Sequence, residues 1–294
     1  GILSAIAALY VIYPDVVFGM GGYASFPTLV AARILRIPVI VHESDSHPGR
    51  TNLWAGKFAK KIAVAFPEAI KYFTKDKVAV TGLPIRKSLL SPIKRGAIEF
   101  LGLEPDAPII YITGGSQGAV NINDAIIDIL PELVKKYQII HQTGTNNFDD
   151  VRSRALLNLE GKDFKERYKL FAYLNETALR MVAGVASLVI SRAGASSIFE
   201  TAAWGIPAII IPIPEEVSHD QRTNAFSYAR SGGAIVIEEK NLSGTILLSE
   251  INRLLSSPEI LKNMSEKALK FAPTNAAEIV AKELIGIGLK HDNQ

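Results

Sequence analysis

The segment YITGGSQGAVNINDAI, residues 111–126, decides the fold because it joins an apolar strand to a helix through a turn of glycines. Gly114, Gly115 and Gly118 let the backbone approach an anion closely. The following helix offers free N–H groups and the positive end of its dipole, and Ser116 adds a hydroxyl donor. The turn has neither the G-x-G-x-x-G spacing nor the lysine of a P-loop. An anion site and a tight turn without a ligand are both open, and for a single glycine turn the second is favoured.

Short apolar runs alternate with amphipathic helical segments along most of the chain, which predicts an α/β fold with parallel sheets. The first part is expected to form four strands, at residues 15–21, 37–43, 61–66 and 77–82, with helices at 26–36 and 51–60. The second part is expected to form six strands, at 108–115, 138–144, 169–174, 187–194, 208–214 and 234–239. Two such series predict two Rossmann-like domains that face each other across a cleft.

Prolines and glycines gather between the two series, which indicates a linker. The expected parts are an N-terminal domain over residues 1–90, a linker over 91–107, a C-terminal domain over 108–271 and a last helix over 272–294. The first series has fewer strands than the second, and the chain begins at Gly1 directly in a segment that is typical of a helix. We therefore expect the N-terminal domain to lack its beginning.

Composition limits the class of protein. Apolar residues make up 48% and charged residues 21% of 294, as in soluble globular proteins. The net charge of +3 is too small to indicate nucleic acid, although it is compatible with an anionic ligand or membrane surface. The absence of cysteine from the sequence excludes disulfides, thiol catalysis and thiolate metal sites. No window holds 18 uninterrupted apolar residues, so no spanning helix is predicted.

Two further glycine turns follow expected strands, in FGMGGYASFP (18–27) and VTGLPIR (80–86). The first places Tyr23 at the start of a helix, and the second ends with Arg86. Open α/β sheets bind ligands at the carboxyl ends of their strands. Three glycine turns at such ends favour a phosphate-bearing ligand over three ligand-free turns.

Charged side chains follow the strand 37–43 directly, where His42, Glu43 and Asp45 stand in the segment VHESDSHPGR. A His–Glu pair can transfer protons or bind a sugar hydroxyl. A metal site is disfavoured because no H-x₃-H or HExxH spacing occurs here. A solvated loop is the competing interpretation.

The segment SRAGASSIFETAAWGIP (191–207) places Arg192 and Glu200 eight residues apart with mostly small residues between them. Ser197 and Glu200 have the spacing of a capping box, which would make this segment only a helix start. A ligand site is the alternative, because the cap explains neither Arg192 nor the run of small residues. Gln221, at the start of a later helix, can read sugar hydroxyls with both its donor and its acceptor, although alone it is typical of a surface position.

Together these motifs resemble the MurG family, the bacterial peptidoglycan N-acetylglucosaminyltransferases that make lipid II. FGMGGYASFP, IPVIVHE, GLPIR, ITGGSQGAVNIN, SRAGASSIFETAAWGIP and DQRTNA occur in the order and spacing of that family. The resemblance runs from about Tyr13 to Phe271 and implies the GT-B fold with metal-independent, inverting chemistry and no cofactor. It also implies that the last helix crosses back to the first domain.

The resemblance assigns roles to residues at matching positions. The diphosphate would contact Ser116 and the backbone of its turn, with Gln117 and Asn123 lining the cleft, and Arg86 and Arg192 facing the nucleotide. Glu200 would bind the ribose hydroxyls, Gln221 the N-acetylglucosamine hydroxyls, and Gly194 and Ala195 belong to the same substrate site. The acceptor side would hold Tyr23, His42, Glu43 and Asp45.

Three departures from the family pattern stand out. The N-terminal G-G-T-G-G-H loop, which supplies a candidate for the catalytic base, is absent from the sequence. Asp45 replaces the asparagine of the family's H-E-Q-N motif, and Asp220 replaces a histidine or glutamine before Gln221. We expect the main base to come from that loop, with His42 or Glu43 assisting.

The resemblance predicts transfer of N-acetylglucosamine from UDP-N-acetylglucosamine to the C4 hydroxyl of lipid I, at the cytoplasmic face of the bacterial membrane, with no nucleic acid as partner. The alternatives are a UDP-N-acetylglucosamine 2-epimerase, another lipid glycosyltransferase, and a noncatalytic fragment that binds a nucleotide sugar. The apolar N-terminal segment, together with Lys57, Lys60 and Lys61 near Trp54 and Phe58, is compatible with a membrane patch. Packing of both aromatic side chains into the core is equally open.

Overall fold

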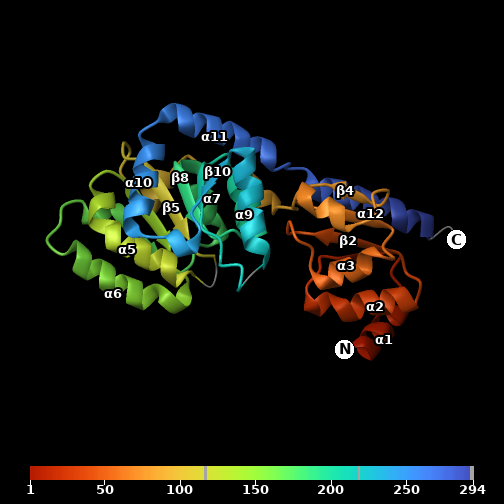
Figure 1. Ribbon diagram of the computed structural model, residues 1–294. Helices are drawn as coiled ribbons and strands as arrows, with labels where there is room; N and C mark the ends of the chain where they lie inside the picture. Colours follow the sequence, from red (N-terminus) through yellow and green to blue (C-terminus); the bar gives the residue numbers. More distant parts are fainter. Residues whose placement is uncertain (116–117, 218, 292–294) are drawn as a thin grey trace. The chain divides into compact units, whose positions relative to one another are not determined.

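The computed structural model describes residues 1–115, 118–217 and 219–291. The chain divides into two compact units (Figure 1), each with its own sheet and core. Unit 1 comprises residues 1–84 and 273–294, and unit 2 comprises residues 85–272. The last helix therefore belongs to unit 1 although the whole of unit 2 lies before it in the sequence.

Unit 1 is built on a parallel sheet with the strand order β1-β2-β3-β4, four strands in the described residues. The strands are β1 (Val17–Gly19), β2 (Val39–Glu43), β3 (Lys61–Val64) and β4 (Val78–Val80). The helices are α1 (Ile2–Ile12), α2 (Phe26–Ile34), α3 (Arg50–Gly56) and α12 (Ala276–His291), with 3-10 turns at Tyr23–Ser25 and Pro67–Tyr72. Residues of α12 and of strands β2 to β4 line one small cavity, so α12 lies against this sheet.

Unit 2 is built on a parallel sheet with the order β10-β9-β8-β5-β6-β7, six strands in the described residues. The strands are β5 (Ile109–Thr113), β6 (Gln138–Gln142), β7 (Tyr168–Phe171), β8 (Leu188–Ser191), β9 (Ala208–Ile210) and β10 (Ala234–Val236). The helices are α4 (Ala97–Leu101), α5 (Val120–Val134), α6 (Phe148–Leu159), α7 (Glu176–Val185), α8 (Ala195–Ala203), α9 (His219–Ser231), α10 (Gly244–Leu255) and α11 (Pro258–Phe271). The 3-10 turns are Lys87–Leu90, Thr145–Asn147, Lys165–Arg167 and Glu239–Asn241.

Helices cover both faces of the sheet in unit 2 because the chain reverses direction across it. From β5 the chain runs through α5 to β6 and through α6 to β7, whereas from β8 it runs the other way through α8 and α9. Right-handed crossovers then place these two sets of helices on opposite faces. Helices α6 and α10 pack against α5, and α9 and α11 pack against α8 (Figure 1). The inner strands β5, β8 and β9 are buried along their length and consist mainly of apolar residues.

The expected strands and their division into two series are confirmed, with ends that are a few residues shorter than expected. The expected extent of the first domain is wrong, because the division falls at Pro84 and the residues after it pack within unit 2. Leu89 is fully buried, and its carbonyl accepts a 2.9 Å hydrogen bond from the Trp204 indole. Prolines and glycines predicted a linker there, but Leu89, Ala97 and Leu101 within this segment are buried in unit 2.

Residues 91–107 likewise form part of unit 2. The Ile93 backbone N–H donates to the Arg180 carbonyl at 2.9 Å, and α4 packs against α7. Ala97 and Leu101 are the buried side chains of α4. In the described part of the chain, no helix combines the length and the apolar character needed to cross a bilayer.

Gly184 tests this packing, because it lies inside α7 where a Cβ atom would overlap the Ile93 carbonyl. Alanine is favoured over glycine in a helix by about 1 kcal/mol, but overpacking against a backbone group costs about 1–3 kcal/mol or more. We expect Gly184→Ala to lower the midpoint of thermal unfolding. Gly286→Ala is the control, because that helical position is open and should keep or raise the midpoint. Equal midpoints for the two variants would contradict the packing of residues 91–96 on α7.

Candidate functional site

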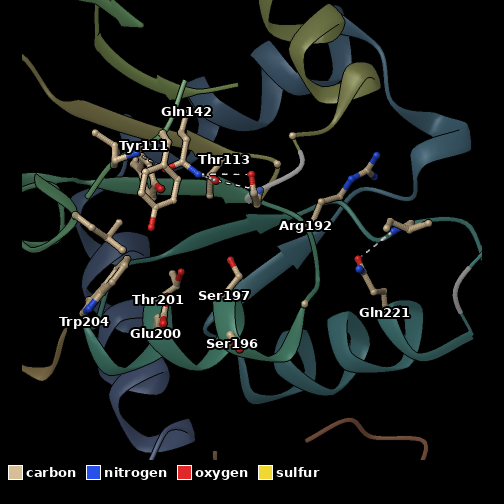
Figure 2. Close-up of a pocket in the computed structure, with 18 of the residues that line it drawn as sticks. Tyr111, Thr113, Gln142, Arg192, Ser196, Ser197, Glu200, Thr201, Trp204 and Gln221 are labelled. Carbon is tan, nitrogen blue, oxygen red and sulfur yellow. Dashed lines mark hydrogen bonds between the residues drawn. The ribbon is translucent and has the colours of Figure 1, made fainter. Parts of the chain in front are cut away.

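A cavity of about 720 Å³ lies in unit 2 at the carboxyl ends of β5 and β8 (Figure 2). These neighbouring strands pair in parallel, with Thr113 opposite Ser191, and the chain leaves them in opposite directions. Such a reversal is where open α/β sheets bind ligands. Residues from both strand ends line the cavity: Arg86, Tyr111, Thr113, Gly114, Gly115, Gly118, Gln142, Tyr173, Leu174, Leu179, Arg192, Gly194, Ser196, Ser197, Glu200, Thr201, Trp204, Ile213 and Gln221.

The glycine turn after β5 forms one wall of the cavity. Gly115 and Gly118 have φ values of 83° and 77°, which favour glycine. A Cβ atom on Gly118 would overlap the Thr143 carbonyl, so the turn packs closely against the loop after β6. Ser116 and Gln117, which were assigned to the diphosphate, lie outside the described residues. The close packing explains why Gly118 is glycine even without a ligand.

Two polar residues that the sequence analysis missed fix this wall. The Thr113 hydroxyl accepts hydrogen bonds from the Gly115 N–H at 3.1 Å and from the Gln142 amide at 3.3 Å. The other end of the Gln142 amide accepts from the Leu174 N–H at 3.0 Å. Gln142 ends β6 in the segment HQTG, so its position at the same edge of the sheet was a usable signal.

The opposite wall is the start of α8. Gly194 precedes the helix with an extended backbone, and Ala195 is its first residue and is buried. Ser197 is already the third helical residue, so the capping-box interpretation of Ser197 and Glu200 is wrong. Ser197 and Glu200 line the cavity from α8 (Figure 2), as the ligand-site alternative requires.

Glu200 is largely buried, and its ion-pair partner is the exposed side chain of Arg86. Its side chain is 20% exposed, and its carboxylate lies 3.6 Å from the guanidinium of Arg86, which is 56% exposed. Burial raises the pKa of Glu200, and the Arg86 charge partly offsets that rise. Arg86 lies equally far, 3.6 Å, from the Glu176 carboxylate. Glu200 therefore presents carboxylate oxygens to the cavity that can accept hydrogen bonds from hydroxyl groups.

Arg192 was expected to face a nucleotide, but its guanidinium is bound by groups of unit 2. Its guanidinium pairs with Glu239 and donates to the carbonyls of Ile211 and Pro212 at 3.2 and 3.4 Å. Both charged side chains are nearly buried, at 13% and 11% exposure. Arg192 thus lines the cavity while its guanidinium is bound to Glu239, because the charge is compensated within unit 2.

Gln221 can offer a ligand fewer hydrogen bonds than expected, because its side-chain oxygen already accepts hydrogen bonds from the protein backbone. The oxygen accepts from the backbone N–H group of Ala193 at 3.2 Å and from that of Ile213 at 3.4 Å, and Figure 2 shows the second of these bonds. The prediction that Gln221 offers both a donor and an acceptor is therefore wrong in part. The NH₂ group remains as the donor that can bind a ligand in the cavity.

Asn123 does not line the cavity, although it was predicted to do so. Its side chain is 1% exposed and lies within the first turn of α5. Its amide donates to the Thr143 carbonyl at 3.3 Å, and its oxygen faces the His141 ring at 3.0 Å. Asn123 therefore lies behind the glycine turn.

In unit 1, His42 and Glu43 end β2 and are buried, at 0% and 4% exposure. Glu43 accepts from the backbone N–H groups of Asp45 and Gly49 and from the Asn52 amide, at 3.0, 3.1 and 2.8 Å. Burial raises the pKa of Glu43 and lowers that of His42. These bonds give Glu43 the task of holding the loop after β2, which differs from its predicted role in proton transfer.

His42 and its surroundings form a second polar cluster in unit 1. The His42 Nε2–H donates to the Gly82 carbonyl at 2.9 Å, and Nδ1 is buried without a hydrogen-bond partner among the described residues. Asn52, which the sequence analysis missed, donates to the His42 carbonyl at 3.0 Å and lies against Gly21. His42 thus connects β2 to the loop after β4, and Asn52 connects β2 to the loop after β1 within unit 1.

The remaining acceptor-side predictions fall on the surface of unit 1. Tyr23 is 92% exposed in the 3-10 turn before α2, and Asp45 is half-buried in the loop held by Glu43. Trp54 and Phe58 pack against the core, with ring centroids 4.9 Å apart, as the core interpretation predicted. Exposed apolar side chains occur instead on α1, among them Leu3, Tyr10, Val11 and Ile12.

The ionisable side chains of the described residues are not arranged as metal ligands. Among the described residues, no three His, Asp or Glu side chains are grouped so that they could hold a metal ion. Tyr111 is buried in β5 beside Thr113, and burial raises the pKa of its hydroxyl. Trp204 closes the end of the cavity near Glu200, and neither aromatic residue was predicted.

The comparisons with known proteins agree with this geometry. Residues 109–280 match the family model described as glycosyltransferase family 28 C-terminal domain, and residues 1–64 match the corresponding N-terminal domain. The solved MurG structure from Acinetobacter baumannii is 26% identical, with a TM-score of 0.74 over 97% of this chain and 77% of that one. A UDP-GlcNAc 2-epimerase from Neisseria meningitidis, bound to UDP-GlcNAc, is 15% identical with a TM-score of 0.72 over 97% and 80%, which shows the fold alone.

Two curated relatives are more similar in sequence. Both are named UDP-N-acetylglucosamine–N-acetylmuramyl-(pentapeptide) pyrophosphoryl-undecaprenol N-acetylglucosamine transferase. The protein from Thermoanaerobacter sp. (strain X514) is 37% identical over 92% of this chain and 73% of its own length. The second protein of that name in Bacillus thuringiensis subsp. konkukian is 38% identical over 91% and 73%. Names and identities both favour a transferase over the 2-epimerase alternative.

Two Rossmann-like units, a cavity at the carboxyl ends of β5 and β8, and the matches to both glycosyltransferase family 28 domains together define a glycosyltransferase of the GT-B fold. The family matches and the curated relatives make the assignment more specific. The chain belongs to the MurG family of N-acetylglucosaminyltransferases, within glycosyltransferase family 28.

The nearly buried pair of Arg192 and Glu239 predicts a measurable contribution to stability. Glu239→Gln leaves the Arg192 charge uncompensated and should reduce the free energy of unfolding by about 1–3 kcal/mol, measured by denaturant titration. Glu238→Gln is the matched control, because the adjacent Glu238 pairs with the more exposed Arg222 and Lys240 and should change stability less. A larger loss in the control variant would show that Arg192 is not held by Glu239.

Proposed function

We propose that the protein transfers N-acetylglucosamine from UDP-N-acetylglucosamine to the C4 hydroxyl of undecaprenyl-pyrophosphoryl-N-acetylmuramoyl-pentapeptide, the conversion of lipid I to lipid II. The observation that carries the proposal is that Glu200, Gln221 and the glycine turn after β5 line one cavity. The names of the curated relatives supply the donor and acceptor. The order of the family motifs along the sequence supports the same assignment.

The diphosphate of the donor would lie at the start of α5. The N–H groups of the first helical turn and the dipole of this 15-residue helix favour an anion there. Gly115 brings the backbone to the cavity without a side chain, so a phosphate can approach it closely. Backbone N–H groups would therefore stabilise the negative charge of the diphosphate, and the positive charge of Arg86, which is half exposed, can contribute as well.

The nucleoside and the sugar would be read by side chains of α8 and α9. Glu200 would accept hydrogen bonds from the two ribose hydroxyls, a task that requires its ionised form. Gln221 would donate from its NH₂ group to a hydroxyl of N-acetylglucosamine, since the protein occupies its oxygen. Gly194 and Ala195 have no large side chain, so the start of α8 would leave room for the nucleoside and the sugar.

The reaction would be a single displacement with inversion. A bond forms between the acceptor O4 and the anomeric carbon, the bond from that carbon to the UDP oxygen breaks, and the hydroxyl proton passes to a base. Charge develops on the departing diphosphate, where the preorganised N–H groups of α5 stabilise it. His42 and Glu43 are engaged in hydrogen bonds within unit 1, which favours a base elsewhere.

The acceptor is a lipid, so the protein would work as a peripheral protein on the cytoplasmic side of the membrane. Two features of unit 1 support contact with an anionic bilayer. The helix α1 exposes apolar side chains, among them Leu3 and Val11, at 82% and 83% exposure. The side chains of Lys57, Lys60 and Lys61 are also exposed in unit 1.

Glu200→Gln tests the ribose assignment. The amide keeps the shape but loses the charge, and a lost charge-assisted hydrogen bond should weaken UDP binding about 10-fold or more by isothermal titration calorimetry. The pH dependence gives a second signature with UDP-N-acetylglucosamine, whose diphosphate does not titrate near neutrality. Affinity of the unmodified protein should fall as acid protonates Glu200, whose pKa is raised, and this fall should vanish in Glu200→Gln.

Glu176→Gln is the matched control for that experiment. Glu176 lies as far from Arg86 as Glu200 does, 3.6 Å, but it does not line the cavity. An exposed ion pair contributes little, so UDP affinity should stay within about twofold. Equal losses in both variants would assign the effect to Arg86 and remove the ribose role from Glu200.

The proposed reaction itself is tested with radiolabelled UDP-N-acetylglucosamine, with and without lipid I in vesicles. Labelled lipid II formed only when lipid I is present is the expected result. Epimerised donor in the absence of lipid I would overturn the transferase proposal. Calorimetric binding of UDP without turnover, even at excess acceptor, would instead indicate a noncatalytic nucleotide-sugar-binding protein.

A further inference from the structure

A chain of buried hydrogen bonds runs behind the glycine turn of unit 2. The Tyr168 hydroxyl lies 2.9 Å from His141 Nδ1, and His141 Nε2 lies 3.0 Å from the Asn123 oxygen. The Asn123 amide then donates to the Thr143 carbonyl at 3.3 Å. His141, Asn123 and Thr143 are all buried, at 0–1% exposure.

The direction of each hydrogen bond follows from the chemistry of its two groups. The Asn123 oxygen can only accept, so His141 must carry its proton on Nε2. Burial lowers the pKa of His141 to about 3, so the ring is neutral and Nδ1 holds a lone pair. Nδ1 therefore accepts from the Tyr168 hydroxyl. One arrangement of protons satisfies the whole chain, and it runs from Tyr168 toward Thr143.

This series of hydrogen bonds ends at the Thr143 carbonyl, which packs against Gly118 of the glycine turn. The Thr143 carbonyl accepts from the amides of Asn123 and Asn147, and it is the atom that a side chain on Gly118 would strike. Asn123 also belongs to the first turn of α5, where its backbone N–H donates to the Ala119 carbonyl at 2.9 Å. The hydrogen bonds of Asn123 thus connect the loop after β6 to the start of α5.

We propose that His141 and Tyr168 are positioning residues, which hold the Gly118 end of the turn and the start of α5 in the arrangement that binds the donor diphosphate. The inference rests on the proposed function, because it assumes that the anion binds at this helix start. Neither residue lines the cavity; both act through Asn123.

Loss of the Tyr168 hydroxyl should disturb the chain at a distance from the ligand. Without that donor, the lone pair on His141 Nδ1 is buried with no group to bind it, and the ring loses one of the two hydrogen bonds that fix its orientation. The bond from His141 Nε2–H to the Asn123 oxygen is then less well held, and so is the Asn123 amide that donates to the Thr143 carbonyl. A neutral hydrogen bond contributes modestly, so Tyr168→Phe should weaken UDP binding about 3- to 10-fold.

Tyr137→Phe is the matched control. Tyr137 belongs to the same core cluster that Tyr168 packs against, and its hydroxyl reaches the Asn252 side chain at 2.8 Å. Each variant removes one hydroxyl from a tyrosine at this core. We therefore expect similar drops in melting temperature, with UDP affinity in Tyr137→Phe within about twofold of the unmodified protein.

The experiment measures UDP binding by calorimetry, melting temperature, and the His141 tautomer by ¹⁵N NMR on the full chain. The expected result is a neutral Nε2–H ring in the unmodified protein, a changed ring signal in Tyr168→Phe, and weaker UDP binding in that variant alone. Unchanged UDP affinity in Tyr168→Phe, or equal losses in both variants, would overturn the positioning role. Failure of the unmodified protein to bind UDP would overturn the proposed function instead.

Discussion

The parallel pairing of β5 with β8 is the constraint on which the site depends. It sets Thr113 opposite Ser191, so the chain leaves both strands at one level of the sheet and turns in opposite directions. Helices α5 and α8 consequently begin at the same edge, and the glycine turn before α5 and the start of α8 line one cavity. The buried strands on either side fix this register, because a shift by one residue would exchange the two faces of β5.

The glycine turns and the order of strands could be predicted because both are written in local sequence. A buried parallel strand is a continuous apolar run, and its end is marked by residues such as Gly114 and Gly115 that permit unusual backbone angles. The run of small residues between Arg192 and Glu200 pointed to Glu200 as a residue of the cavity, whereas Gln221 was assigned only by the family resemblance. Local signals therefore located the edge of the sheet where the site lies.

The partners of those residues could not be predicted, because each lies far away in the sequence. Arg192 is satisfied by Glu239, and the Gln221 oxygen by the N–H groups of Ala193 and Ile213. Sequence spacing shows which side chains are available but not which of their atoms the fold has already bound. The same limit applies to Leu89, whose carbonyl accepts a hydrogen bond from the indole of Trp204, a residue 115 positions later.

These internal partners bear on how an anion would be bound in unit 2. A buried cation without a counter-charge would be costly, and the fold avoids this by pairing Arg192 with Glu239. Backbone N–H groups at the start of α5 carry only partial charges, so they bring no such penalty. The glycine turn before them packs at Gly118 against the Thr143 carbonyl, which accepts from Asn123, and Asn123 in turn accepts from His141. A site of this kind stabilises charge as it develops on a leaving diphosphate, because its dipoles need no rearrangement when the bond breaks.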